Sequence, residues 1–360
     1  MNSNQNFLSV ENLSVNFNLF RGVENTTIQA VRNVSFTMKK GEILGIVGES
    51  GSGKSVTTSS IAGLLPKNAQ VEGKIFFEET DLLSLFNLSR SKTKLKKNAA
   101  KQLRLFRGKK IGMIFQEPGR AFDPLQNMYS VFFETFRNKD NKITKEQAYQ
   151  KAVQLLTETG IDRAEERLQN FPHQFSGGQL QRIGIALALA QDCELLIADE
   201  PTTALDVTIQ KQIIELLLDL RNKRNISIIF ISHNIDLVAE ISDRIMVMYG
   251  GMIMEIGNWQ QIYKNPKHPY TKALLSVSPA FGSHYSTNPL SPIPGKVTDP
   301  ANPEPGCPFY PRCSLTKDSQ NKCLSCKETL PELLSVTDEN EEQFVRCALF
   351  NRSELNEVNQ

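Results

Sequence analysis

The sequence predicts an α/β fold built around a mainly parallel sheet, and three observations support this prediction. Apolar stretches typical of buried strands, such as residues 42–48 and 193–200, alternate with helical patterns such as residues 54–65, and this alternation is typical of parallel sheets. A glycine-rich loop joins the first of those strands to the following helix. Beyond Asn265 the chain becomes rich in proline and turn residues, which predicts a small, irregular C-terminal region.

The chain opens with two stretches, residues 7–17 and 28–38, in which apolar and polar residues alternate. Such alternation predicts a pair of antiparallel strands. Residues 82–110 are polar and basic, and within them we expect a solvated surface insertion at 87–107, with lipid headgroups or nucleic acid as the alternative contacts. The remaining elements are expected as strands at 111–115 and 226–233, helices at 144–160, 178–191, 208–223 and 234–241, and a hairpin at 244–256 that turns at Gly250 and Gly251.

Composition excludes several classes of function. The 41 basic and 39 acidic side chains give a net charge of only +2, so nucleic acid is not an expected partner. Apolar runs such as residues 185–190 are far shorter than the roughly 20 residues that span a bilayer. The N-terminal residues do not resemble a secretory signal. We therefore expect a cytosolic protein, in which disulfides are rare and clustered cysteines point to metal or redox chemistry.

The loop "GESGSGKS", residues 48–55, predicts a phosphate-binding site. It fits the pattern G-x-x-x-x-G-K-[ST] and lies between a predicted strand and a predicted helix, which is the context that supports such a match. Its glycines let backbone N–H groups surround phosphate oxygens, Lys54 would reach the β- and γ-phosphates, and Ser55 would bind Mg²⁺. The residues expected to contact the nucleotide here are Gly48, Glu49, Ser50, Gly51, Ser52, Gly53, Lys54, Ser55 and Val56.

Two acidic residues end the apolar stretch "LLIADE", residues 195–200. Asp199 at the strand end suits the Mg²⁺ shell, and Glu200 can activate the attacking water as a general base. With the phosphate loop upstream, these carboxylates predict hydrolysis of a nucleoside triphosphate.

The stretch "FSGGQLQR", residues 175–182, begins the helix ahead of the acidic strand. A serine and two glycines at a helix N-terminus form a second anion-binding position that has no lysine. On a chain with one phosphate loop, this favours contact with the nucleotide of another subunit, and a simple helix N-cap is the alternative interpretation.

The order of these motifs resembles the ATP-binding cassette (ABC) ATPases. The resemblance implies a P-loop NTPase (RecA-like) core with an antiparallel β subdomain and an α-helical signature subdomain at about 117–180, and it implies ATP and Mg²⁺ as cofactors. It further implies that Gln116 senses Mg²⁺ and the attacking water, that Asp206 bridges two sites across a dimer, and that His233 holds the γ-phosphate. The residues implied to contact the partner's γ-phosphate are Ser176, Gly177, Gly178 and Gln179. An aromatic side chain would stack on adenine; Phe17 is the first candidate and Phe20 the second, and the alternative is that Phe17 belongs to the core.

Four stretches resemble one subgroup, the ATPases of oligopeptide and dipeptide importers with their nickel-importing relatives: residues 30–55, 171–182, 199–213 and 265–275. The markers "HPYT", "PIPG" (292–295) and "GCPFYPRC" (306–313) add to this resemblance. The implied domains are an ATPase domain at 7–264 and a transporter-type C-terminal region at 265–350. The implied assembly holds a second ATPase subunit, two membrane permeases and an extracytoplasmic binding protein, with this chain peripheral at the cytoplasmic face. Import of nickel chelates or another small solute, and a non-transport ABC ATPase, are the alternatives.

Cysteines gather near the C-terminus, where four of the six lie within residues 305–330 and Cys347 follows. Four thiolates suit either Zn²⁺ or a [4Fe–4S] cluster, and spacing alone does not separate the two. The subgroup resemblance implies the [4Fe–4S] cluster, held by Cys307, Cys313, Cys326 and Cys347, with Cys323 as the alternative third ligand. Reduced thiols without a metal are the other interpretation.

Overall fold

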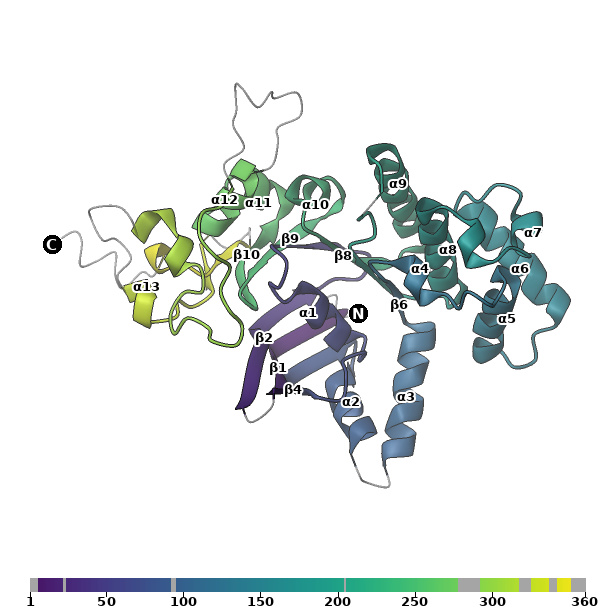
Figure 1. The fold of residues 1–360 in the computed structure, drawn as a ribbon, viewed down its shortest axis with the longest axis horizontal. Coiled ribbons are helices and arrows are strands. Elements are labelled where there is room, and N and C mark those ends of the chain that lie inside the picture. Colours follow the sequence, from purple (N-terminus) through teal and green to yellow (C-terminus); the bar gives the residue numbers. More distant parts are fainter. Residues whose placement is uncertain are drawn as a thin grey trace, which may run out of the picture. The chain divides into compact units, whose positions relative to one another are not determined.

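The computed structural model describes residues 6–21, 24–91, 95–203, 205–277, 292–316, 325–336 and 342–350. The chain divides into two compact units, of which the first comprises residues 1–38, 43–83 and 232–360 and the second comprises residues 39–42 and 84–231. Figure 1 labels the helices and strands described below. Within the described residues, none of the helices combines the length and apolarity needed to cross a bilayer.

An antiparallel sheet in the first unit has the strand order β2-β1-β4-β5. Its strands are β1 (Leu8–Arg21), β2 (Glu24–Met38), β4 (Ala69–Phe77) and β5 (Thr80–Asp81). The predicted pairing of the first two strands is present, with Leu8 opposite Met38 and Phe17 opposite Ile28. The sequence analysis did not predict β4, which adds to the other edge of β1.

The second sheet of the first unit carries the phosphate loop. β3 (Ile43–Val47) pairs in parallel with β9 (Arg244–Tyr249), and β10 (Met252–Asn258) returns from it as the predicted hairpin. All five residues of β3 are buried, as expected for a strand in the interior of a parallel sheet. The remaining elements of this unit are α1 (Lys54–Ile61), α10 (Ile235–Ile241), α11 (Trp259–Lys264), α12 (Pro269–Val277), α13 (Ser325–Glu328), β11 (Leu334–Ser335), β12 (Phe344–Val345) and the short 3₁₀ turns at Tyr310–Arg312, Ser314–Thr316 and Ala348–Phe350.

The second unit contains the parallel strands β8-β7-β6 and a layer of helices. The strands are β6 (Ile111–Ile114), β7 (Leu195–Asp199) and β8 (Ser227–Ser232). The helices are α3 (Lys96–Lys109), α4 (Pro118–Ala121), α5 (Met128–Lys139), α6 (Lys145–Glu158), α7 (Ala164–Arg167), α8 (Gly177–Ala190) and α9 (Val207–Arg224), with a 3₁₀ turn at Pro172–Gln174. Helix α2 (Leu82–Arg90) follows β5. The polar and basic stretch therefore forms two helices, α2 and α3, in its described part.

Candidate functional site

The phosphate loop runs from the end of β3 to the start of α1, as the sequence predicted. Gly53 precedes the helix with φ = 96°, a conformation that favours glycine, and a Cβ atom there would lie 2.6 Å from the carbonyl oxygen of Ala30. Gly51 also has a positive φ of 79°. The backbone shape of the loop therefore favours glycine at both positions.

Lys54 is buried, and its ammonium group is directed into the loop. Its Nζ donates hydrogen bonds to the carbonyl oxygens of Gly48 at 2.8 Å and Glu49 at 3.0 Å. The buried hydroxyl of Ser52 has no hydrogen-bond partner among the described residues, and the side chain of Ser55 is exposed. The loop thus offers a lysine and a hydroxyl that can donate hydrogen bonds to phosphate, and an exposed hydroxyl oxygen that can bind Mg²⁺.

In the second unit, Glu200 follows β7 with a strained backbone and a fixed carboxylate. Its φ is 48°, an unusual value for a non-glycine residue that is found preferentially at functional sites. Its Oε2 accepts hydrogen bonds from Gln116 Nε2 at 3.1 Å and from Thr203 Oγ1 at 2.9 Å. Thr203 is a hydrogen-bond partner of Glu200 that the sequence analysis missed. Because β6 and β7 are parallel neighbours, Gln116 and Glu200 follow strand ends at the same edge of the sheet.

Asp199 lies at the end of β7 with its side chain buried. A buried carboxylate at a strand end is suited to bind a cation. The structure thus brings Gln116, Asp199 and Glu200 to one edge of the second unit. Lys54 and His233, which is exposed after β8, belong to the first unit.

Ser176 and Gln179 form a capping box at the start of α8. The Ser176 hydroxyl accepts from the Gln179 backbone N–H at 3.3 Å, and Gln179 Oε1 accepts from the Ser176 backbone N–H at 3.0 Å. Gly177 is exposed, whereas Gly178 is buried against Ile209 of α9. Within one chain, two of the four residues therefore cap the helix, one packs on its neighbour and one faces outward.

Asp206 caps the next helix, since its carboxylate accepts from the Ile209 backbone N–H at 2.9 Å. The side chain is exposed, so the same carboxylate remains accessible to a partner. Of the adenine-stacking candidates, Phe17 lies on β1 and is half-buried, and the side chain of Phe20 lies outside the described residues.

The four cysteines Cys307, Cys313, Cys326 and Cys347 are all buried and reduced. Burial, and then the neighbouring thiols, raise the pKa of Cys307 to about 12 and that of Cys347 to about 11. The backbone N–H of Cys307 donates to the carbonyl oxygen of Cys326 at 2.8 Å. Cys323 lies outside the described residues. The four thiols gather in one region, but no group of His, Cys, Asp and Glu among the described residues is arranged to hold a metal ion.

Two family models match different parts of the chain, and known proteins match most of its length. Residues 31–203 match the ABC transporter family, and residues 254–323 match the oligopeptide/dipeptide transporter C-terminal region. The chain is 42% identical to the dipeptide transport ATP-binding protein DppD of Bacillus subtilis, over 95% of this chain and 94% of that protein. It is 45% identical to the oligopeptide transport ATP-binding protein OppD of the same organism, over 85% and 81% of the two chains.

The fold also resembles that of solved structures. A dimeric ATP-binding cassette in a post-hydrolysis state, bound to ADP and Pi, superimposes with a TM-score of 0.58 and 26% identity, covering 70% of this chain and 98% of that one. This confirms the predicted fold class, and the chain is an ATPase of the ABC type. The chain belongs to the family of ABC transporter ATP-binding proteins that includes the dipeptide and oligopeptide transport proteins DppD and OppD.

Proposed function

We propose that this chain hydrolyses ATP to energise uptake of dipeptides or oligopeptides across the cytoplasmic membrane. The observation that carries the proposal is the combination of an ABC ATPase site with a C-terminal region of the oligopeptide/dipeptide type in one chain. The similarity to DppD and OppD over most of their lengths supports peptides as the substrate class. A nickel chelate or another small solute is the second candidate, and a non-transport ATPase is the third.

The predicted site residues have separate proposed roles in ATP hydrolysis. Lys54 and the loop N–H groups would hold the β- and γ-phosphates, and Ser55, Gln116 and Asp199 would bind Mg²⁺. Glu200 would take a proton from the attacking water, because Gln116 and Thr203 hold its carboxylate in one orientation. His233 would contact the γ-phosphate, and Phe17 would stack on adenine.

We also propose that two such ATPase subunits close on two ATP molecules. The exposed N-terminal turn of α8, with Ser176 and Gly177, would face the γ-phosphate bound by the partner subunit, and Asp206 would lie between the two sites. The dimeric state of the structurally similar cassette supports this arrangement. Closure would move two membrane permeases, which receive substrate from an extracytoplasmic binding protein, and so drive translocation of that substrate. This chain would be peripheral at the cytoplasmic face of the membrane.

The buried thiols are proposed to hold a [4Fe–4S] cluster, with Zn²⁺ as the alternative. Four buried cysteines whose charges act on one another supply the type and number of ligands that either group takes, although the described thiols are not arranged around a metal position. Cys307, Cys313, Cys326 and Cys347 would be the ligands, and Cys323 the alternative third ligand. When bound, the group would crosslink a C-terminal region whose apolar content is low. Anaerobic purification with measurement of iron, sulfide and zinc tests this, and stoichiometric zinc without iron would exclude the cluster.

Uptake of a labelled dipeptide by cells that depend on this chain tests the transport proposal. Lys54→Ala should abolish uptake, because the phosphates lose their main cation, whereas Lys67→Ala at an exposed position outside the loop should leave uptake unchanged. Parallel uptake assays with labelled nickel test the second candidate substrate, a nickel chelate. Recovery of ribosomes or DNA-repair factors with the purified chain, without any permease, would contradict the importer proposal.

A further inference from the structure

Glu49 of the phosphate loop is held by residues of the C-terminal region. We propose that Arg312 is a positioning residue for ATP: it fixes Glu49, and through Glu49 the loop that receives the phosphates. Nucleotide affinity then depends on the fold of the cysteine-containing region around residues 292–316. This proposal rests on the proposed role of residues 48–55 in holding phosphate.

The guanidinium of Arg312 is buried and makes a forked ion pair with Glu49. Its Nη1 donates to Glu49 Oε2 at 2.5 Å and its Nη2 donates to Glu49 Oε1 at 3.1 Å. Its other donors bind the carbonyl oxygens of Ile293 and Pro294 and the hydroxyl of Tyr249. The side chain of Arg312 is 3% exposed and that of Glu49 is 27% exposed. All five N–H donors of the guanidinium are used, so its position is fully determined.

Glu49 transmits this position to Lys54. Its backbone N–H donates to Tyr270 Oη at 2.9 Å, and its carbonyl oxygen accepts from Lys54 Nζ at 3.0 Å. The carboxylate, the N–H and the carbonyl group of one loop residue are therefore each engaged. A displacement of Arg312 would release the loop at the residue that also binds the phosphate-binding lysine.

An aromatic cluster keeps Arg312 in place. Phe309 packs against Tyr249 at 5.4 Å and Tyr270 at 5.2 Å between ring centroids. The Arg312 guanidinium lies 5.7 Å from the centre of the Tyr249 ring. Arg312 directly precedes the buried Cys313 in the chain. Residues of "HPYT" and "GCPFYPRC" thus contact Glu49 directly, and "PIPG" contacts Arg312, which gives a physical reason for the three markers on one chain.

Replacement of Arg312 by methionine tests the proposal. Arg312→Met removes the fork while it keeps an unbranched side chain, and it leaves the Glu49 carboxylate without its partner. We expect affinity for a fluorescent ATP analogue to weaken at least tenfold. Arg346→Met is the matched control, because Arg346 is also buried in the C-terminal region but binds the carbonyl oxygens of Ile253 and Pro331 and makes no contact with the loop. The affinity of the Arg346→Met variant for the ATP analogue should stay within twofold of that of the unmodified chain.

Further variants separate the possible failures. Glu49→Gln in the Arg312→Met background should recover part of the lost affinity, because the unpaired carboxylate is then neutral. Should Arg312→Met fail to fold, Arg312→Lys keeps the charge without the fork and should weaken binding to a lesser degree. Unchanged affinity in the Arg312 variants, or an equal loss in Arg346→Met, would overturn the positioning role. If Lys54→Ala also bound ATP normally, the phosphate-loop assignment itself would be wrong.

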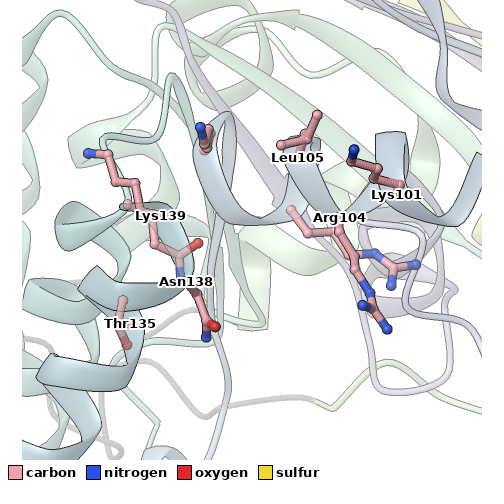
Figure 2. A pocket seen from close by; sticks show the side chains of 9 residues that line it. Lys101, Arg104, Leu105, Thr135, Asn138 and Lys139 are labelled. Carbon is pink, nitrogen blue, oxygen red and sulfur yellow. The ribbon is translucent and has the colours of Figure 1, made fainter. Parts of the chain in front are cut away.

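A cavity in the second unit carries a separate inference from different residues. We infer that it binds phosphate groups, supplied either by a free polyphosphate or by anionic lipid headgroups at a membrane surface. The cavity has a volume of about 540 Å³ and lies between α3 and the ends of α5 and α8, a size suited to a small-molecule ligand. Figure 2 shows Lys101, Arg104 and Leu105 on one side of it and Thr135, Asn138 and Lys139 on the other.

The charges that line this cavity are all positive: Lys101, Arg104, Arg107, Lys109 and Lys139. Lys139 forms an ion pair with Asp192, which lies outside the lining, and the carboxyl ends of α5 and α8 offset part of the remaining charge. Lys101, Arg104 and Lys109 make no ion pair within the described part of the chain. Burial, followed by the charges of Arg104 and Arg90, lowers the pKa of Arg107. Like charges held together in a hollow favour binding of an anion.

Tripolyphosphate and phosphatidylglycerol vesicles separate the two sources of such phosphates, with saturating ATP present to fill the nucleotide site. Lys101→Glu with Arg104→Glu should reduce binding of one probe at least tenfold. Lys96→Glu with Lys97→Glu makes the same change of charge on the same helix at exposed positions outside the cavity, and should reduce it less than threefold. Binding of neither probe, or equal losses in both double variants, would refute the site.

Discussion

Among single residues, Glu200 is the one on which the proposed hydrolysis of ATP depends most. Because Gln116 and Thr203 bind its Oε2, Glu200→Gln should preserve the fold and the binding of ATP while it removes the base. We expect the rate of phosphate release to fall by about 10²-fold or more, the usual contribution of a positioned general base.

The measurement is ATP turnover beside binding of a fluorescent ATP analogue. Glu215→Gln on the exposed face of α9 makes the same chemical change away from the site and should keep full turnover. Full activity in Glu200→Gln would show that another group activates the water.

Residues at the site differ in how well the sequence could predict them. Lys54 follows from the loop pattern at 48–55, and Asp199 and Glu200 follow from the end of the apolar stretch at 195–200, because each pattern occupies a few consecutive residues. Arg312 and Glu49 are 263 residues apart and form their ion pair only through tertiary structure. Thr203 could not be predicted as a partner of Glu200, because the turn after β7 directs the Thr203 hydroxyl toward the Glu200 carboxylate and no sequence pattern used above indicates that turn.

At the scale of single elements, helix α8 offers a matched test of packing. Gly178 and Gly184 both lie in this helix. A Cβ atom at position 178 would lie 2.8 Å from Ile209 Cγ2, whereas a Cβ atom at position 184 would meet no atom within 4 Å. Since Ile209 is β-branched and stiff, Gly178→Ala should destabilise the fold by about 1–3 kcal/mol.

Gly184→Ala should stabilise the fold by about 1 kcal/mol or less, because alanine loses less backbone entropy than glycine when a helix forms. Thermal unfolding of both variants, followed by circular dichroism, compares them directly. A higher unfolding temperature for Gly178→Ala than for Gly184→Ala would contradict the packing argument.

Elements also differ in predictability, for physical reasons. Strands β3 and β7 are continuous apolar runs between turn residues and were predicted close to their observed bounds. Strand β4 was missed because Gly73 and its charged neighbours interrupt the apolar alternation, and the strand is stabilised by its pairing with β1. The basic stretch forms helix α3 because Ala99 and Leu103 bury one face of it, a face that a count of charges does not show.

For the whole molecule, the sequence was sufficient for the fold class and the family, because the motif order and the two matched regions carry both. It was not sufficient for the link between the C-terminal region and the phosphate loop. That link is built from buried polar residues, among them Arg312, His268 and Glu255, whose partners are distant along the chain.

The buried His268 makes the stability of the folded chain depend on pH. Burial lowers the pKa of His268 from 6.5 to about 3, and the side chain is 1% exposed. The folded state therefore excludes a proton that the unfolded state binds below pH 6.5. Stability is fully present above that value and is lost as the pH falls toward 3. Between pH 7.5 and 5.5 the loss should be about 1.4 kcal/mol.

His268→Gln removes the titrating group and can still accept the hydrogen bond that the backbone N–H of Tyr270 donates at 3.0 Å. Urea unfolding of both proteins at pH 7.5 and 5.5 gives the two losses. Glu255, whose pKa burial raises, acts in the opposite direction where the pH exceeds its unfolded value, and it is present in both chains, so the difference between the losses isolates His268. The variant should lose about 1.4 kcal/mol less than the unmodified chain over this interval. Equal losses would mean that His268 is protonated to the same extent in the folded and unfolded chains, which its complete burial beside the cationic Arg346 disfavours.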